Sequence, residues 1–314
     1  MLTPAELAQA EKICCTGPHR GCVLHFTRGD APETPSREWE QLQAQAERNR
    51  QYFQAHLARN RLEIRQLARQ LQNTILLLQE DDALRCRAGR VSPSLAWRAS
   101  ALGDSRVFDR QHPGSPEDLS VDILLDASAS QNRRQEQLAA QTYILAEALS
   151  LCRIPVRVLS FCSVSGCTVL REYRGYREDR GNDRIFEFAA AGWNRDGLAL
   201  RAVDWLLRRS EDRRRLLLVL TDANPNDDTR IPGTGKQLFS RDYSGKPAVA
   251  DAAGEAAGLR RHGTAPLCLF SGREGDLGSA RAIYGRDVVR LPSAGWLART
   301  VGKIIQGRLR AAED

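Results

Sequence analysis

The sequence has no apolar run that approaches the roughly 20 residues needed for a membrane-spanning helix. Its N-terminus, MLTPAELAQAEK, also lacks the basic start and the apolar centre of a signal peptide. These two absences predict a cytoplasmic protein that does not insert into a membrane. The eight cysteines are scattered over 314 residues, so we expect reduced thiols rather than a disulfide framework.

Lysine is scarce, since it accounts for only four of the 46 basic residues, and the net charge is +7. Such an arginine bias can reflect genomic composition, in which case the arginines form an ordinary solvated surface of mixed charge. Arginine binds carboxylates as readily as phosphates, so an acidic protein partner is at least as plausible as a nucleic acid. We therefore expect no nucleic-acid partner, and binding to DNA or RNA would have to show a steep salt dependence.

Catalytic and nucleotide-binding motifs are also missing. No spacing of Ser, Cys and His indicates a nucleophile with its base. The segment Gly233–Lys236 resembles a phosphate loop, but Arg230 stands in place of the first glycine, Gln237 replaces Ser or Thr, and no strand precedes it. The glycines after residue 271 are spaced by threes, unlike a dinucleotide-binding fingerprint. The sequence predicts a protein that is not an enzyme.

Two apolar segments end in oxygen-bearing side chains. The first, VDILLDASAS, ends with Asp126, Ser128 and Ser130, and the second, RLLLVLT, is followed by Asp222. The carboxyl ends of parallel strands meet at one edge of a sheet, so these side chains are expected to converge. They are the hard ligands that Mg²⁺ or a similar cation such as Mn²⁺ prefers, with a position left open for a carboxylate of another molecule. The alternative is that a serine caps the following helix, and capping is compatible with metal binding.

The first 35 residues contain a short helical pattern and then a segment rich in Gly, Pro, Cys and His. Cys14, Cys15, His19, Cys22 and His25 could supply four zinc ligands, but no pair has the usual C-x₂-C spacing. An irregular loop with small buried thiols is the favoured interpretation, and the zinc site remains an alternative.

Residues 36–117 are expected to form a helical region and a linker. From residue 36 to about 78 there is no Gly or Pro, and apolar residues recur at three, four or seven positions. One helix of about 43 residues would reach roughly 65 Å, longer than the face of a domain. It would therefore pair with the N-terminal helix, fold back on itself after a break, or bind a partner. A short helix is possible around residues 94–101.

Residues 118–314 alternate between strand-like apolar runs and helical patterns of ten to twenty residues, which indicates a parallel sheet covered on both faces. We expect an α/β, Rossmann-like domain with a central, mostly parallel sheet, preceded by the helical extension. Residues 223–244 are expected to be a long loop. The expected strands cover residues 121–126, 155–161, 168–173, 215–221, 265–270 and 287–290, and the expected helices 133–152, 197–209, 247–262, 277–284 and 294–309.

The motif Asp126-Ala-Ser128-Ala-Ser130 resembles the start of the metal-ion-dependent adhesion site (MIDAS) of von Willebrand factor A (vWA) domains. The third ligand loop of that family normally offers a threonine, and the matching segment WNRDGLAL has Asn194 in its place and Asp196 as a substitute. The segment LTDANPND resembles the last loop, with alanine where glycine is usual. The resemblance implies a metal site formed by Asp126, Ser128, Ser130, Asn194, Asp196 and Asp222.

Within the superfamily, TDANPND at 221–227 and RAGRV at 87–91 resemble the nitric oxide reductase activation protein D (NorD) family, whereas NRDGLAL at 194–200 is closer to the cobaltochelatase T subunit (CobT). Both relatives are implied to work with a hexameric MoxR-type AAA+ ATPase that remodels a metalloenzyme or drives metal insertion. The resemblance implies a chaperone-like adaptor that couples such an ATPase to a client protein. The alternative is a vWA subunit of a cobalt or magnesium chelatase that acts on a tetrapyrrole.

Overall fold

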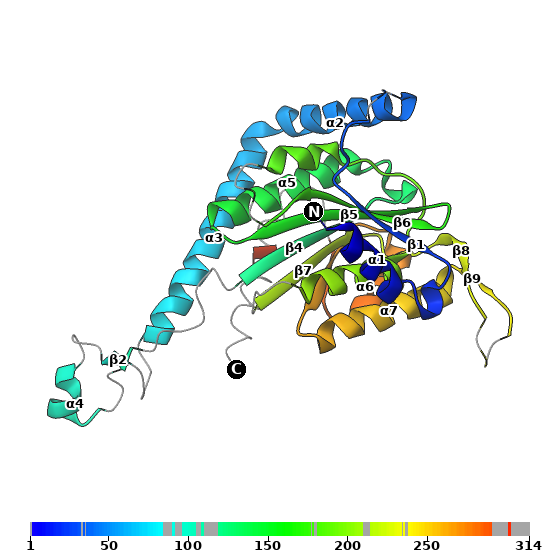
Figure 1. The fold of residues 1–314 in the computed structure, drawn as a ribbon. Coiled ribbons are helices and arrows are strands. Elements are labelled where there is room, and N and C mark those ends of the chain that lie inside the picture. Colours follow the sequence, from blue (N-terminus) through cyan, green and yellow to red (C-terminus); the bar gives the residue numbers. More distant parts are fainter. Residues whose placement is uncertain are drawn as a thin grey trace.

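The computed structural model describes most of the chain (Figure 1), namely residues 2–32, 34, 36–83, 90–91, 96–104, 108–109, 119–176, 178, 181–209, 214–233, 235, 238–290 and 301–302. A seven-stranded sheet with the order β1-β6-β5-β4-β7-β10-β11 lies at its centre. Its strands are β1 (Val23–Thr27), β4 (Leu119–Asp126), β5 (Val156–Val164), β6 (Cys167–Arg174), β7 (Arg214–Thr221), β10 (Ala265–Phe270) and β11 (Val288–Arg290). Only the β5–β6 pair is antiparallel, which confirms the predicted α/β class with a mostly parallel sheet.

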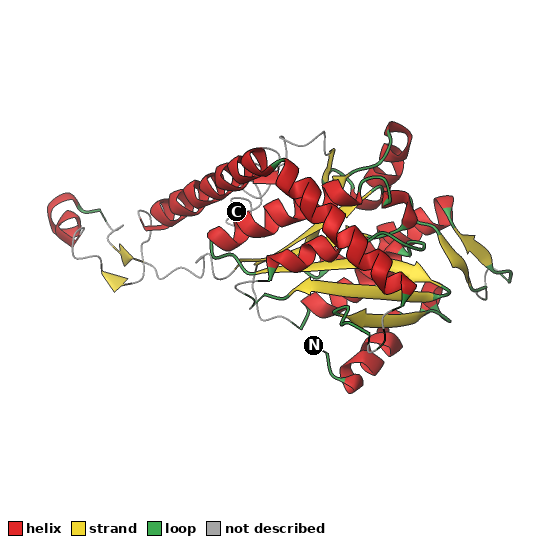
Figure 2. Cartoon of the chain, turned by 90° about the horizontal axis from the view of Figure 1, so that it is seen from above, coloured by secondary structure: helices red, strands yellow, loops and turns green. Residues whose placement is uncertain are grey.

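Helices cover both faces of this sheet (Figures 1 and 2). Strand β4 is buried along its whole length, and its side chains alternate between two cores. Ile123 and Leu125 belong to the core under α5 and the two long helices α2 (Arg37–Ala55) and α3 (Leu57–Ala83). Leu124 belongs to the core under α1, α6 and α7. The helices of this part are α1 (Pro4–Cys14), α5 (Gln135–Leu151), α6 (Asp196–Leu207), α7 (Gly245–Arg261) and α8 (Leu277–Tyr284).

The long helical segment is two helices, α2 (Arg37–Ala55) and α3 (Leu57–Ala83), which are separated at His56. The side chain of Asn60 donates a hydrogen bond to the carbonyl of Phe53 (3.0 Å), so a carbonyl freed by the break is satisfied. Both helices pack against α5. Helix α3 then leads away from the central sheet towards α4 (Ala96–Leu102) and the two-stranded antiparallel sheet of β2 (Arg90–Val91) and β3 (Phe108–Asp109) (Figure 1). Although α3 has 27 residues, no helix within the described ranges has both the length and the apolar character needed to cross a membrane.

Several elements were not expected from the sequence. The Cys/His-rich segment contains the strand β1, which extends the sheet by pairing in parallel with β6. The expected loop after residue 222 contains an antiparallel hairpin of β8 (Asp227–Ile231) and β9 (Arg241–Tyr243). Short 3-10 helices are η1 (Gly17–His19), η3 (Ala129–Gln131), η4 (Asn182–Glu187) and η5 (Glu274–Asp276). The expected last helix, 294–309, lies outside the described residues except for 301–302, which are helical.

Candidate metal site at the carboxyl edge of the sheet

The parallel pairing of β4 with β7 brings Asp126 beside Thr221 and Asp222 at one edge of the sheet. Asp126 is completely buried. One of its carboxylate oxygens accepts a hydrogen bond from the Thr221 hydroxyl (2.9 Å), and the other accepts one from the backbone N–H of Ser128 (2.9 Å). These two bonds fix the carboxylate and the turn that follows it. The sequence predicts a role for Asp126 and Ser128 but none for Thr221.

The hydroxyls of Ser128 and Ser130 lie 2.9 Å apart after the end of β4. Ser128 precedes η3 but makes no capping hydrogen bond through its side chain, and the N-cap residue of α5 is Arg134, also without a side-chain cap. The capping alternative for the two serines is therefore wrong. Their oxygen atoms stay available beside the buried carboxylate, and Ser130 is exposed to solvent.

In the third loop, which is the segment that contains residues 193–200, the side chains of Asn194 and Asp196 differ in their hydrogen bonds. The side-chain amide of Asn194 donates to the carbonyl of Asn224 (3.3 Å), and its oxygen accepts from the backbone N–H of Asn226 (3.1 Å), so Asn194 joins the third loop to the last loop. Asp196 is the first residue of α6 and is only 1% exposed, yet neither of its carboxylate oxygens has a hydrogen-bond partner in the structure. Of these two residues, Asp196 is therefore the one whose side-chain oxygens are not used in a hydrogen bond between the loops.

The last loop explains why alanine is tolerated where glycine is usual. Ala223 has a φ of +53°, in the left-handed region that glycine favours, at a cost of roughly 1–2 kcal/mol for an alanine. The residue is buried, and its N–H donates to the hydroxyl of Thr221 (2.9 Å). The hydrogen bond and the close packing hold the strained turn that positions Asp222.

Three carboxylates lie at this edge, and the positive charge of Arg134 offsets only part of the rise that burial causes in the pKa of Asp222. Burial, followed by the charge of Asp222, raises the pKa of Asp126 to about 6. Burial also raises the pKa of Asp222, and burial together with the charges of Asp126 and Asp222 raises the pKa of Asp196 well above its usual value. None of the three forms an ion pair with a described Arg, Lys or His. Clustered acids of this kind favour a cation.

The edge is accessible from outside through a pocket of about 380 Å³. Ser128, Ser130 and Asn194 line it, together with Trp193, a residue that is 45% exposed. A group carried by another molecule can therefore reach the hydroxyls of the two serines from solvent.

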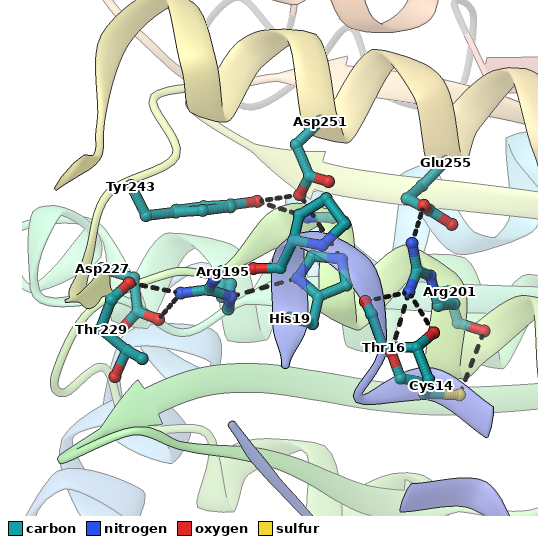
Figure 3. A network of polar contacts seen from close by, with 12 residues as sticks. Cys14, Thr16, His19, Arg195, Arg201, Asp227, Thr229, Tyr243, Asp251 and Glu255 are labelled. Atoms are coloured by element: carbon teal, nitrogen blue, oxygen red, sulfur yellow. Dashed lines mark hydrogen bonds and ion pairs between the residues drawn. The ribbon is translucent and has the colours of Figure 1, made fainter. Parts of the chain in front are cut away.

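The third loop is held from behind by Arg195, the largest fully buried side chain of the described structure (Figure 3). Its guanidinium pairs with Asp227 (2.6 Å) and donates to the carbonyls of Thr229 (2.7 Å) and Pro18 (2.6 Å). It also lies over the ring of Tyr243, with 4.2 Å from the guanidinium carbon to the ring centroid. One arginine therefore ties the third loop to the N-terminal segment and to the β8–β9 hairpin.

Gly197 completes this anchoring because a larger residue would not fit. A Cβ at this position would lie 1.9 Å from a carboxylate oxygen of Asp251 and 3.0 Å from the hydroxyl of Tyr243. The backbone N–H of Gly197 donates to that hydroxyl (3.0 Å), which in turn donates to Asp251 (2.8 Å). The close contact holds the start of α6, and with it Asp196, against α7.

His19, Asp251 and Glu255 form the one group of three potential metal-ligating side chains within 4.8 Å of one another that the described residues contain (Figure 3). Their hydrogen bonds do not suit an ion, because Arg201 donates to Glu255 (2.5 Å) and Tyr243 donates to Asp251. Burial, with nearby arginines, lowers the pKa of His19 to about 2. Its Nδ1 accepts from Arg195 (3.1 Å), so the proton of the neutral ring is on Nε2, 3.5 Å from Asp251.

The other zinc candidates of the N-terminal segment do not join such a group among the described residues. Cys14 is buried with its thiol 3.9 Å from the carbonyl of Arg201, and burial raises its pKa to about 11. Burial likewise raises the pKa of Cys15 to about 12. In the metal-free protein both thiols are thus protonated at neutral pH.

Mg²⁺ should stabilise the protein more at about pH 7.5 than at about pH 5. Because the pKa values of Asp126, Asp196 and Asp222 are raised, the metal-free folded state binds more protons than the unfolded chain between about pH 4 and about pH 6. The stability of the metal-free protein therefore falls as the pH rises through this interval. A bound cation compensates the deprotonated acids, so its stabilising effect is largest above the interval. The difference between the melting temperatures in MgCl₂ and in EDTA measures the stabilisation at each pH. An equal difference at both pH values would contradict the prediction.

No family model matches the chain. The chain is similar to Protein NorD of Stutzerimonas stutzeri, with 28% identity over 160 residues that cover 50% of this chain and 24% of that protein. Protein NorD of Brucella suis biovar 1 is also 28% identical, over 187 residues that cover 56% of this chain and 29% of that protein. This chain thus resembles NorD proteins but spans less than a third of their length.

A solved structure of similar fold is the vWF domain of the type V pili tip protein Mfa5 from Porphyromonas gingivalis. It aligns with a TM-score of 0.46 and 10% sequence identity, and the alignment covers 62% of this chain and 95% of that chain.

Proposed function

We propose that this protein is a cytoplasmic, non-enzymatic vWA adaptor that binds Mg²⁺, or a similar cation such as Mn²⁺, at the carboxyl edge of its sheet and uses it to hold a carboxylate of a partner protein. The observation that carries the proposal is the state of Asp196, whose two buried carboxylate oxygens have no hydrogen-bond partner beside two further unpaired acids. Buried acids in a purely structural role are normally paired.

The donor set fits a hard cation. The hydroxyls of Ser128 and Ser130 would bind directly, and Asp126, Asp196 and Asp222 directly or through water, because these described carboxylates do not all lie within 4.8 Å of one another. Asn194 would position the loop rather than bind, since both ends of its amide are already engaged. Bound Mg²⁺ would supply an electrophilic contact at an open coordination position.

The proposed partner is a MoxR-type AAA+ ATPase, and the adaptor would couple it to a client protein that is activated or receives a cofactor. Support comes from the similarity to NorD proteins and from the TDANPND segment, whose strained turn and buried Asp227 belong to the site described above. The segment at 194–200 does not favour a tetrapyrrole chelatase, because Asn194, Arg195 and Gly197 serve to anchor the loop.

Capture of a co-expressed MoxR-type ATPase by the tagged protein tests this proposal. We expect capture in MgCl₂, loss of capture in EDTA, and loss in the Asp222→Asn variant, because each change removes the bridge between the two proteins. Asp228→Asn is the matched control, since Asp228 lies in the same segment, is exposed, and accepts a hydrogen bond from the Thr229 hydroxyl (3.3 Å). Capture that is unchanged by both EDTA and Asp222→Asn would refute the adaptor.

A further inference from the structure

A groove of about 820 Å³ lies beside the candidate metal site and shares Ser130 and Asp222 with it. Its walls are the start of the segment that leads into α5 and the loop between β10 and η5. A Cβ at Gly272 in this loop would lie 2.6 Å from the ring of Phe270 and 2.8 Å from the carbonyl oxygen of Asp222. Glycine therefore lets this wall approach the last ligand loop closely.

Three arginines, Arg133, Arg134 and Arg273, line the groove and are exposed. The side chains of many other arginines in the described structure, such as Arg28 and Arg171, are engaged by carboxylates. No ion pair or side-chain hydrogen bond of these three is found among the described residues. Positive charge next to the metal site is thus left for a ligand.

The chemistry of the lining indicates what kind of ligand fits. Guanidinium groups bind carboxylates in a two-pronged geometry, so three of them suit a series of carboxylates. The lining has no aromatic side chain on which a base could stack, and Asp222 and Asp276 would repel a continuous phosphate backbone. A peptide can place neutral residues opposite these two acids and charged residues opposite the arginines.

We propose that the groove binds an acidic segment of the partner protein, in which one carboxylate reaches the metal site and neighbouring carboxylates pair with Arg133, Arg134 and Arg273. This inference rests on the proposed function for the contact at the metal, whereas the arginine contacts are independent of it. The groove would determine the specificity for the partner, because a contact between one carboxylate and a cation can be made by many proteins.

The test measures fluorescence anisotropy of a labelled octapeptide of alternating Glu and Gly in MgCl₂ with the complete chain. Its Gln/Gly counterpart and a single-stranded DNA oligonucleotide of similar charge serve as comparison probes. The triple variant Arg133→Gln, Arg134→Gln, Arg273→Gln should bind the acidic peptide roughly tenfold more weakly, with a flatter salt dependence. The matched control is the triple variant Arg261→Gln, Arg281→Gln, Arg286→Gln, which removes three exposed arginines that do not line the groove.

The two proposals fail separately. If EDTA and Asp222→Asn weaken binding but the groove variant binds like the wild type, the metal site stands and the groove proposal is overturned. If the groove variant loses affinity but EDTA has no effect, the groove stands and the metal bridge is refuted. The proposal that the ligand is an acidic segment would also be overturned by either of two results. One is a Gln/Gly peptide that binds as tightly as the Glu/Gly peptide, and the other is an oligonucleotide that binds more tightly than the Glu/Gly peptide.

Discussion

Asp126→Asn should abolish the stabilisation by Mg²⁺ and leave the metal-free protein at least as stable as the wild type at about pH 7.5. The buried carboxylate is destabilised by desolvation and by Asp222, so removing its charge relieves the metal-free state. The asparagine oxygen can still accept one of the two hydrogen bonds from Thr221 and Ser128. In the wild type, Mg²⁺ at about one hundred times its Kd should add about 2.7 kcal/mol, or roughly 5 °C in melting temperature.

Asp122→Asn is the control for this experiment because it alters the same residue type on the same strand. Asp122 is also fully buried, but it is paired with Arg157 (2.6 Å). Its replacement leaves Arg157 without its partner and should cost about 3 kcal/mol while the response to Mg²⁺ persists. If Asp126→Asn instead destabilises the metal-free protein and keeps the response, Asp126 has only a structural role.

Arg195→Met should lower the free energy of unfolding by about 3–5 kcal/mol, since it leaves the buried carboxylate of Asp227 and two carbonyls without their donor. It should also weaken Mg²⁺ binding, because the neighbouring Asp196 loses the anchor of its loop. Denaturant unfolding in EDTA measures the first effect and Mg²⁺ titration the second.

Arg230→Met is the comparison for this substitution. Arg230 pairs with Asp242 (3.0 Å) on the β8–β9 hairpin, but the two side chains are 57% and 77% exposed. Its loss should cost less than about 1 kcal/mol. Similar losses in the two variants would mean that the buried network does not hold the loop.

The sequence predicts the centre of the fold well because apolar runs of six or seven residues between helical patterns have the length of buried strands and are too short for helices. Strands β4 and β7 end within a residue of their predicted positions, which is why Asp126 and Asp222 were recognised. The strand β1 was missed because it is a short edge strand that includes a histidine, and β8 was missed because its sequence, DDTRI, is mostly charged. Neither follows an apolar pattern that can be read locally.

The anchoring of the site could not be read from the sequence, because it joins side chains that are distant along the chain. Arg195 contacts Pro18, Asp227 and Thr229, and nothing near residue 195 indicates these partners. His19 was considered as a zinc ligand, and only the donor at its Nδ1 shows that it belongs to this network. The break at His56 was equally hidden, since the chain there contains neither Gly nor Pro.

The most direct test of the central claim is titration of the metal-free protein with Mn²⁺, followed by the relaxation rate of water protons. A bound ion with an open, water-occupied position enhances this rate, and partner carboxylates would displace that water. We predict one such ion for each chain, lost in Asp126→Asn and retained in Asp122→Asn. No enhancement in the wild type, or the same enhancement in Asp126→Asn, would contradict a metal site at the ends of β4 and β7.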